Sequence, residues 1–220
     1  MNSSAAKTKK LVILAMFCAM AYVLMAVGRI PIVLFLKYDP KDIIITIAGF
    51  LFGAPSALAV SFVVSLIEML TLSDTGIIGF FMNVLSTASF ACTAAVFYKR
   101  HHNLKGAIMG LVIGSVAMVV VMLLWNYLIT PLYMGVSRQD VAALILPAFL
   151  PFNLIKGVLN AAITMLIYKP VVGTLTRMHL VEPHKGSAGM NAVDKITYIA
   201  ICLFVLATCV LCFLVLAGKI

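Results

Sequence analysis

The sequence predicts an all-α membrane protein, in which a six-helix transmembrane bundle is followed by a seventh transmembrane helix at the C-terminal end. Of the 220 residues, 64% are hydrophobic and only 10% are charged, whereas a soluble domain is about half apolar and about a quarter charged. The apolar residues form long runs without the alternation of strands. Such runs predict spanning helices, which satisfy every backbone polar group within the hydrocarbon, and not an outer-membrane barrel.

The first apolar run, 11–28, follows the basic residues Lys7, Lys9 and Lys10. It is longer than the core of a typical signal peptide, and no A-x-A cleavage site of the usual kind follows it, so we expect a spanning helix. The next segment, 29–42, is polar and contains prolines, which predicts a loop.

The apolar stretch 43–72 is too long for one helix, and the GAPS sequence at 53–56 divides it. It predicts helices at 42–53 and 55–72, of which the first is short for a full span and is therefore tilted or extended into the preceding loop. Further helices are expected at 77–98, 106–129, 148–169 and 196–217.

The connections between these helices are polar. SDTG at 73–76 predicts a tight turn, and the TP sequence at 130–131 is expected to end a helix. The loop 132–146 contains SRQD at 137–140, a sequence suited to capping a short helix. The chain thus divides into a six-helix membrane domain at 1–178, a cytoplasmic linker at 179–194 and the additional helix at 195–220.

Basic residues predict that the N-terminus lies in the cytoplasm and that the protein crosses the cell membrane several times. This orientation places most of the 16 Lys and Arg residues, including the densest clusters, on the cytoplasmic side, as the positive-inside rule requires. The net charge of +9 therefore reflects membrane topology and does not indicate a nucleic-acid partner.

Helix 148–169 carries a polar stripe, because Asn153, Lys156 and Asn160 are spaced i, i+3, i+7 and share one face. A stripe of this kind would be costly against lipid, so we expect it to face a cavity in the bundle. Gly157 beside it permits close approach of a ligand or a helix. The stripe predicts a polar pocket that opens to the outside.

Polar residues from the first outer loop and three other helices converge on the same depth: Arg29, Asp39, Lys41, Glu68, Asn83 and Asn126. Structural alternatives exist for single residues. Glu68 pairs with Lys41 or Arg29 in one such alternative, and Asn83 forms an interhelical hydrogen bond in another. Lys156 alternatively extends to the lipid headgroups. Their convergence favours a binding pocket.

The sequence lacks the motifs of nucleotide hydrolysis and of common hydrolases, since no GxxxxGK[ST], HExxH or GxSxG is present. The histidines fall in the cytoplasmic loops, and the five cysteines lie inside apolar runs, where a packing role is expected. These observations predict a protein that is not an enzyme, holds no metal or cofactor, and does not power transport by itself.

Two patterns of small residues predict close helix packing. Gly106, Gly110 and Gly114 form a GxxxGxxxG stripe, which we expect to pack inside the bundle. Ala15 and Ala19 form AxxxA on the first helix, a common pattern that has little meaning alone.

Three motifs resemble those of the riboflavin-binding S components of energy-coupling-factor (ECF) vitamin transporters: LKYDPKD at 36–42, NYLITPLYMG at 126–135 and PFNLIKG at 151–157. The resemblance covers residues 8–178 approximately. It implies a six-helix capture subunit that binds riboflavin from the outside as a transported ligand. It also implies docking, through the AxxxA pair Ala15 and Ala19, on a transmembrane coupling subunit that carries two cytoplasmic ATPase subunits, and inward release when the subunit topples in the membrane.

Riboflavin chemistry then assigns roles within the predicted pocket. An Asn amide offers the donor and acceptor that the dione edge of isoalloxazine needs, so Asn126 and Asn153 are expected there, with Lys156 donating to a ring carbonyl. Asp39 is expected to bind ribityl hydroxyls. The remaining candidates are Leu36, Tyr38 and Phe152 as apolar faces for the ring, and Glu68 and Asn83 as further polar lining.

Two alternatives stay open: an S component for another vitamin or for FMN, and a stand-alone ion-coupled transporter. The second should show internal repeats or broken midplane helices, which the sequence lacks. The helix at 196–217 departs from the family pattern, which ends after six helices. It would place the C-terminus outside, either as an accessory span or as an element that alters docking.

Overall fold

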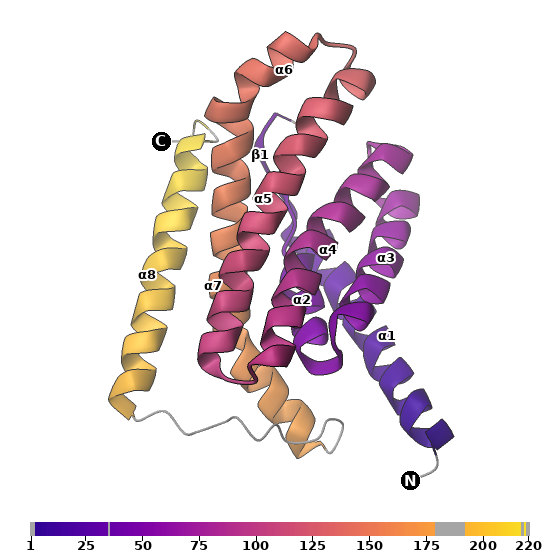
Figure 1. Cartoon of the computed structure of the whole chain (residues 1–220), viewed down its shortest axis with the longest axis vertical. Helices are drawn as coiled ribbons and strands as arrows, with labels where there is room; N and C mark the ends of the chain where they lie inside the picture. Colours follow the sequence, from indigo (N-terminus) through magenta and orange to yellow (C-terminus); the bar gives the residue numbers. More distant parts are fainter. Residues whose placement is uncertain (1–2, 35, 179–191, 217, 219–220) are drawn as a thin grey trace.

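The computed structural model describes residues 3–34, 36–178, 192–216 and 218, which form a bundle of long helices with a short β-hairpin at one end (Figure 1). The elements in chain order are α1 (Ser3–Gly28), β1 (Ile30–Val33), β2 (Leu36–Tyr38), α2 (Lys41–Phe52), α3 (Ala54–Thr71), α4 (Gly76–Arg100), α5 (Leu104–Met134), α6 (Arg138–Leu144), the π-helix η1 (Ile145–Phe149), α7 (Leu150–Arg177) and α8 (Ala192–Leu216).

Six helical segments of the described residues are long and apolar enough to cross a membrane: Ser4–Gly28, Ala54–Thr71, Gly76–Arg100, Leu104–Met134, Arg138–Arg177 and Tyr198–Leu216. The predicted all-α membrane fold is therefore confirmed. The short helix α2 is not among these spans, because its 12 residues extend about 18 Å against a hydrocarbon core of about 30 Å. Nearly all of α2 is buried by its neighbours, so it is an interior element of the bundle.

The segment predicted as a loop at 29–42 instead contains an antiparallel hairpin, β1–β2. Its register pairs Ile30 with Tyr38 and Val33 with Leu36, and an irregularity between Pro31 and Val33 shifts the pairing. Proline is compatible with this two-stranded sheet because both strands are edge strands, where a missing N–H need not break a ladder. The hairpin places Leu36 and Tyr38 as buried side chains at the end of the bundle opposite the N-terminus.

Two helices extend past their expected ends and continue through a proline. α5 continues beyond Thr130 and Pro131, both buried, and stops at Gly135, whose left-handed φ of 67° suits glycine. α7 likewise continues through Pro170 to Arg177, because Val171 and Leu175 still pack on the core. Packing on both sides of each proline outweighs the single backbone hydrogen bond that it removes.

The expected capping sequence at 137–140 does begin a short helix. Ser137 Oγ accepts from the backbone N–H of Asp140, and the Asp140 carboxylate accepts from the backbone N–H of Ser137. This reciprocal pair starts α6, and η1 then joins α6 to α7 without a break.

The glycine stripe packs inside the bundle, as the sequence predicts. A Cβ at Gly110 would lie 2.7 Å from the backbone oxygen of Ala94, and one at Gly114 would lie 2.6 Å from that of Phe90. Only glycine permits α5 to lie this close to α4. The close α4–α5 contact fixes one wall of the bundle.

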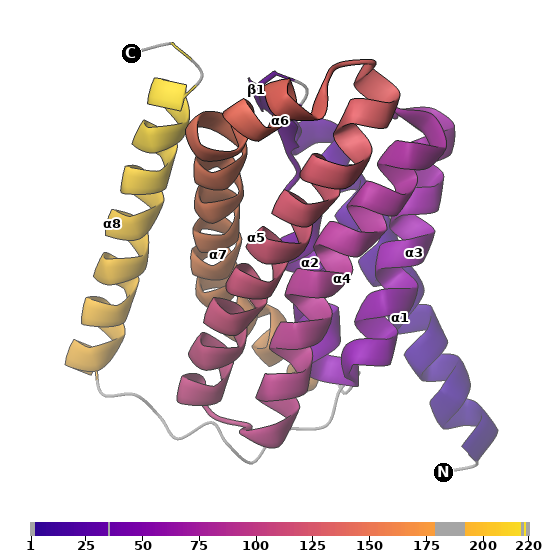
Figure 2. The same cartoon turned by 45° about the horizontal axis from the view of Figure 1, so that its top comes forward.

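Helices α1 and α8 lie on opposite sides of the bundle, as both views show (Figures 1 and 2). α8 packs against α7 and the hairpin, whereas α1 packs against α2 and α3. Figure 2 also places the hairpin and α6 at the end opposite the N-terminus. Most of the predicted linker 179–194 lies outside the described residues, and α8 begins at Ala192.

Candidate ligand-binding site

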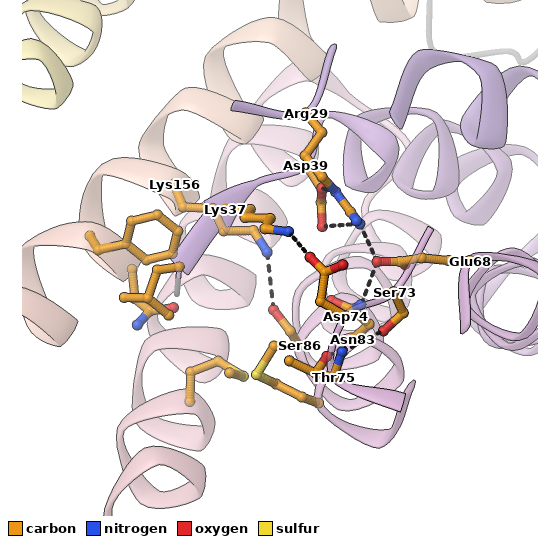
Figure 3. A pocket seen from close by; sticks show the side chains of 15 residues that line it. Arg29, Lys37, Asp39, Glu68, Ser73, Asp74, Thr75, Asn83, Ser86 and Lys156 are labelled. Carbon is orange, nitrogen blue, oxygen red and sulfur yellow. Dashed lines mark hydrogen bonds and ion pairs between the residues drawn. The ribbon is translucent and has the colours of Figure 1, made fainter. Parts of the chain in front are cut away.

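A cavity of about 250 Å³ lies at the end of the bundle that carries the hairpin (Figure 3). Its walls come from the hairpin region, the α3–α4 turn, and helices α3, α4, α5 and α7. The lining residues are Arg29, Leu36, Lys37, Asp39, Glu68, Ser73, Asp74, Thr75, Met82, Asn83, Ser86, Met122, Phe152, Asn153 and Lys156. The cavity therefore combines charged, amide and apolar surfaces.

Glu68 is the acceptor at the centre of the first charge cluster beside this cavity (Figure 3). Its carboxylate is 2% exposed and accepts from Arg29, from Lys41 and, at 2.8 Å, from Asn83 Nδ2. Arg29 also donates two hydrogen bonds to Asp39 in a bidentate pair, with Nε–Oδ1 at 2.6 Å and Nη2–Oδ2 at 3.2 Å. Glu68 was expected to pair with Lys41 or with Arg29 as a structural alternative, and in the structure it pairs with both.

Asp42 organises a second cluster behind the cavity. Its side chain is fully buried, and its Oδ1 accepts from Thr87 at 2.6 Å. Oδ2 lies 3.2 Å from Lys156 Nζ and accepts from Asn160 Nδ2 at 3.2 Å. Asn160 Oδ1 in turn accepts from the Tyr38 hydroxyl at 2.9 Å. The cluster thereby joins α2, α4, α7 and the hairpin.

Lys156 is held within the bundle and does not extend to the membrane surface. It is 6% exposed, and its ammonium lies 3.2 Å from Asp42 and 3.3 Å from Ser86 Oγ. The ammonium has three N–H donors, so it can bind these two partners and still direct one N–H toward the cavity that the side chain lines. Lys156 is therefore positioned to donate to a ligand atom.

The two predicted amides differ in position. Asn153 lines the cavity and donates from Nδ2 to the backbone oxygen of Phe149 at 2.7 Å. Asn126 lies one helical turn beyond the lining residue Met122, and its Oδ1 accepts from Thr130. Its Nδ2 is buried and has no hydrogen-bond partner among the described residues, an arrangement that costs free energy unless a further acceptor arrives.

Seven of the nine predicted ligand-binding residues line the cavity: Leu36, Asp39, Glu68, Asn83, Phe152, Asn153 and Lys156. Asn126 and Tyr38 lie outside the lining, and Tyr38 instead connects to Asn160 behind it. Apolar walls are supplied by Leu36 and Phe152, as expected, and also by Met82 and Met122. Their roles toward a ligand stay predictions.

Sequence reasoning gave no role to the outermost pair at the cavity. Lys37 of the hairpin and Asp74 of the α3–α4 turn form an ion pair at 2.5 Å (Figure 3). The hydrogen bond from Lys37 holds the pKa of Asp74 below its usual value. The pair joins two segments that are distant in the sequence. Both residues were expected in outer loops, but single-sequence patterns do not reveal which loop residues meet.

Asp42 was also missed as a site residue, because it was expected in the first outer loop. An acidic residue in the first turn of a helix is ordinary at a helix N-terminus. Its burial follows from the packing of the whole of α2 inside the bundle. The polar stripe on α7 was the available signal, since a buried Lys156 requires a carboxylate partner.

We expect Asp42→Asn to destabilise the protein, because Lys156 would be left as a buried cation without its nearest carboxylate. Breaking a buried pair costs about 3–5 kcal/mol. The free energy of unfolding of the full chain is measured by SDS titration in mixed micelles. The control is Asp74→Asn, which removes a carboxylate from an exposed pair and should leave the unfolding curve near that of the wild type. Equal curves for the two variants would contradict the role given to Asp42.

Known proteins resemble this chain in sequence and in overall fold. Residues 9–168 match the family model described as the ECF transporter, substrate-specific component. The riboflavin transporter RibU of Staphylococcus aureus (strain TCH60) is 32% identical over 182 residues, which cover 78% of this chain and 95% of that protein. The riboflavin transporter FmnP of Bacillus subtilis (strain 168) is 29% identical over 175 residues, covering 74% of this chain and 91% of that protein.

A solved structure described as the S component of a bacterial ECF transporter superimposes with a TM-score of 0.66 at 30% identity. It covers 78% of this chain and 99% of that one. The match includes the helical membrane fold, and the family is one of transport proteins and not of enzymes. The chain belongs to the substrate-specific (S) components of ECF transporters.

Proposed function

We propose that this S component captures riboflavin from outside the cell and delivers it through an ECF coupling module. The observation that carries the proposal is the cavity itself, where Asn153 and Lys156 of α7 stand beside the apolar side chains Leu36 and Phe152. A flat heteroaromatic ligand needs this combination of polar edge and apolar face. The distant relatives named as riboflavin transporters support the same ligand.

The isoalloxazine ring presents carbonyl oxygens and a ring N–H along its dione edge. In the proposed complex, Asn153 pairs with this edge, and Lys156 donates to a ring carbonyl. Asn126 contributes the buried Nδ2 that has no partner among the described residues. A ligand acceptor at that position would remove the cost of an unpaired donor. Binding would then satisfy a polar group that the ligand-free protein leaves unsatisfied.

The ribityl chain is proposed to lie toward the outer mouth of the cavity. Asp39, Glu68 and Asn83 line this region beside the polar residues of the α3–α4 turn. Carboxylates accept hydrogen bonds from hydroxyls, and amides both donate to them and accept from them, so these groups suit a polyol. The carboxylates are already held by cations, so they meet the ligand in fixed positions. Tyr38 lies behind the lining residues, where its hydroxyl donates to Asn160.

Partners and orientation follow from family membership and charge. Family membership implies an ECF coupling subunit with its two ATPase subunits, and the basic residues before α1 favour a cytoplasmic N-terminus. Ala15 and Ala19 are exposed on α1, whereas Ile13, Phe17 and Ala21 face the core. The small residues therefore lie on the outward face of α1, where a second helix has access to them.

Riboflavin binding is tested by titrating the ligand-free full chain and following the quenching of flavin fluorescence. Asn153→Ala and Lys156→Ala are each expected to weaken binding about 5- to 150-fold, because an unpaired buried partner costs about 1–3 kcal/mol. Lys169→Ala is the matched control, since Lys169 lies exposed near the other end of α7. FMN is titrated in parallel to separate the two flavins.

These titrations test separately where the ligand binds and whether it is a flavin. Wild-type affinity in both Asn153→Ala and Lys156→Ala would place the ligand elsewhere in the bundle. Absence of quenching by riboflavin in the wild type would reject the flavin assignment while leaving the family unchanged.

Docking is tested by co-purification with the coupling module of the same cell. Replacing Ala15 and Ala19 together by Leu is expected to abolish co-purification, because the larger side chains prevent close helix approach. Riboflavin affinity should stay unchanged, since α1 does not line the cavity. In the matched control, Leu replaces Ala200 and Ala207 of α8, which are also exposed. This variant should co-purify with the coupling module like the wild type. Loss of co-purification in the control alone would place the docking face on α8.

A further inference from the structure

We propose that Phe213 of α8 is a positioning residue for the ligand cavity, which braces the hairpin and so slows the escape of bound ligand. The effect on escape rests on the proposed riboflavin-binding function, whereas the effect on the hairpin does not. α8 lies outside residues 9–168, the part of the chain that matches the family model. Its contacts in this structure indicate its role.

The carrying observation is an aromatic cluster around Phe213. Its ring centroid lies 5.8 Å from that of Tyr38 on the hairpin, at an interplanar angle of 56°. It also lies 5.9 Å from the ring of Phe152 on α7, at 33°. Both geometries are within the range of favourable aromatic pairs. Phe152 and Leu36, which belongs to the same packed cluster, line the cavity.

Only one face of α8 makes these contacts. Cys202, Cys209 and Phe213 follow helical spacing and are at most 8% exposed, which is the pattern of a helix seated along one stripe. Phe204 on the outward face of the same helix is 74% exposed. α8 therefore packs one face against the bundle, and Phe213 on that face forms a ring pair with Tyr38 of the hairpin.

Tyr38 links this brace to the polar side of the cavity. Its ring packs against Phe213, while its hydroxyl donates to Asn160 Oδ1 at 2.9 Å. Asn160 donates to Asp42, which lies 3.2 Å from Lys156 Nζ. Displacement of the hairpin from the bundle would separate Tyr38 from both Phe213 and Asn160. The aromatic contact therefore opposes opening of the hairpin at its buried edge.

The contact between Phe213 and Tyr38 would affect a bound ligand through the hairpin, because the hairpin forms part of the cavity wall. Leu36, Lys37 and Asp39 all line the cavity, and the outer Lys37–Asp74 pair is largely exposed, with side-chain exposures of 36% and 77%. Exposed ion pairs contribute little to stability. The buried contact with Phe213 is thus the stronger of these two restraints on the hairpin.

The test compares Phe213→Ala with Phe204→Ala, which removes the same side chain from the outward face of α8. The first readout is hydrogen–deuterium exchange of the peptides covering 30–38 in the ligand-free full chain. The second is the riboflavin dissociation rate, followed by recovery of flavin fluorescence. We expect Phe213→Ala to accelerate exchange in 30–38 and to raise the dissociation rate about three- to tenfold, as for loss of one or two aromatic contacts. Phe204→Ala should change neither.

The outcomes separate this proposal from the proposed function. Unchanged exchange in 30–38 in Phe213→Ala would overturn the brace, whatever the unfolding temperature. An unchanged dissociation rate despite faster exchange would overturn its effect on ligand escape. If the wild type does not bind riboflavin, the flavin assignment fails, and the exchange result alone decides the brace. Should Phe213→Ala fail to fold, Phe213→Leu retains the packing volume without the aromatic pair, and faster exchange in that variant is the expected result.

Discussion

A balanced set of buried charges holds together the end of the bundle that carries the cavity. Glu68 joins Arg29 and Lys41, and Asp42 joins Lys156. Asp39 completes the set through its bidentate pair with Arg29. Each unpaired charge would be costly in this environment, so the positions of the cations and the carboxylates depend on one another. The shape of the cavity therefore depends on these ion pairs.

The charge clusters hold a short helix inside the bundle and a two-stranded hairpin at its end. α2 is too short to span, yet Lys41 and Asp42 in its first turn bind partners on α3, α4 and α7. The hairpin is attached to α3 by Arg29 at its base, which donates to Glu68, and to α7 by Tyr38 at its inner edge, which donates to Asn160. The cavity walls are therefore fixed before a ligand arrives, which lowers the ordering cost of binding.

Local patterns predict much of this structure, whereas tertiary partners are harder to predict. The long apolar runs, the glycine stripe and the capping sequence at 137–140 each act within one or two helices, and the structure confirms them. The stripe on α7 indicated a cavity because lipid is a poor solvent for amides and amines. Pairing in the hairpin, the burial of Asp42 and the contact of Phe213 with Tyr38 join distant segments, and no local period encodes them.

The proposed ligand of this cavity is a flavin, bound between its polar and apolar walls. The most direct measurement is the visible absorption and fluorescence of the full chain, purified in mild detergent without added ligand. The proposal predicts a yellow preparation with a flavin spectrum and quenched flavin fluorescence, because no group of the protein itself absorbs in that range. A colourless preparation that also fails to quench added riboflavin would contradict it.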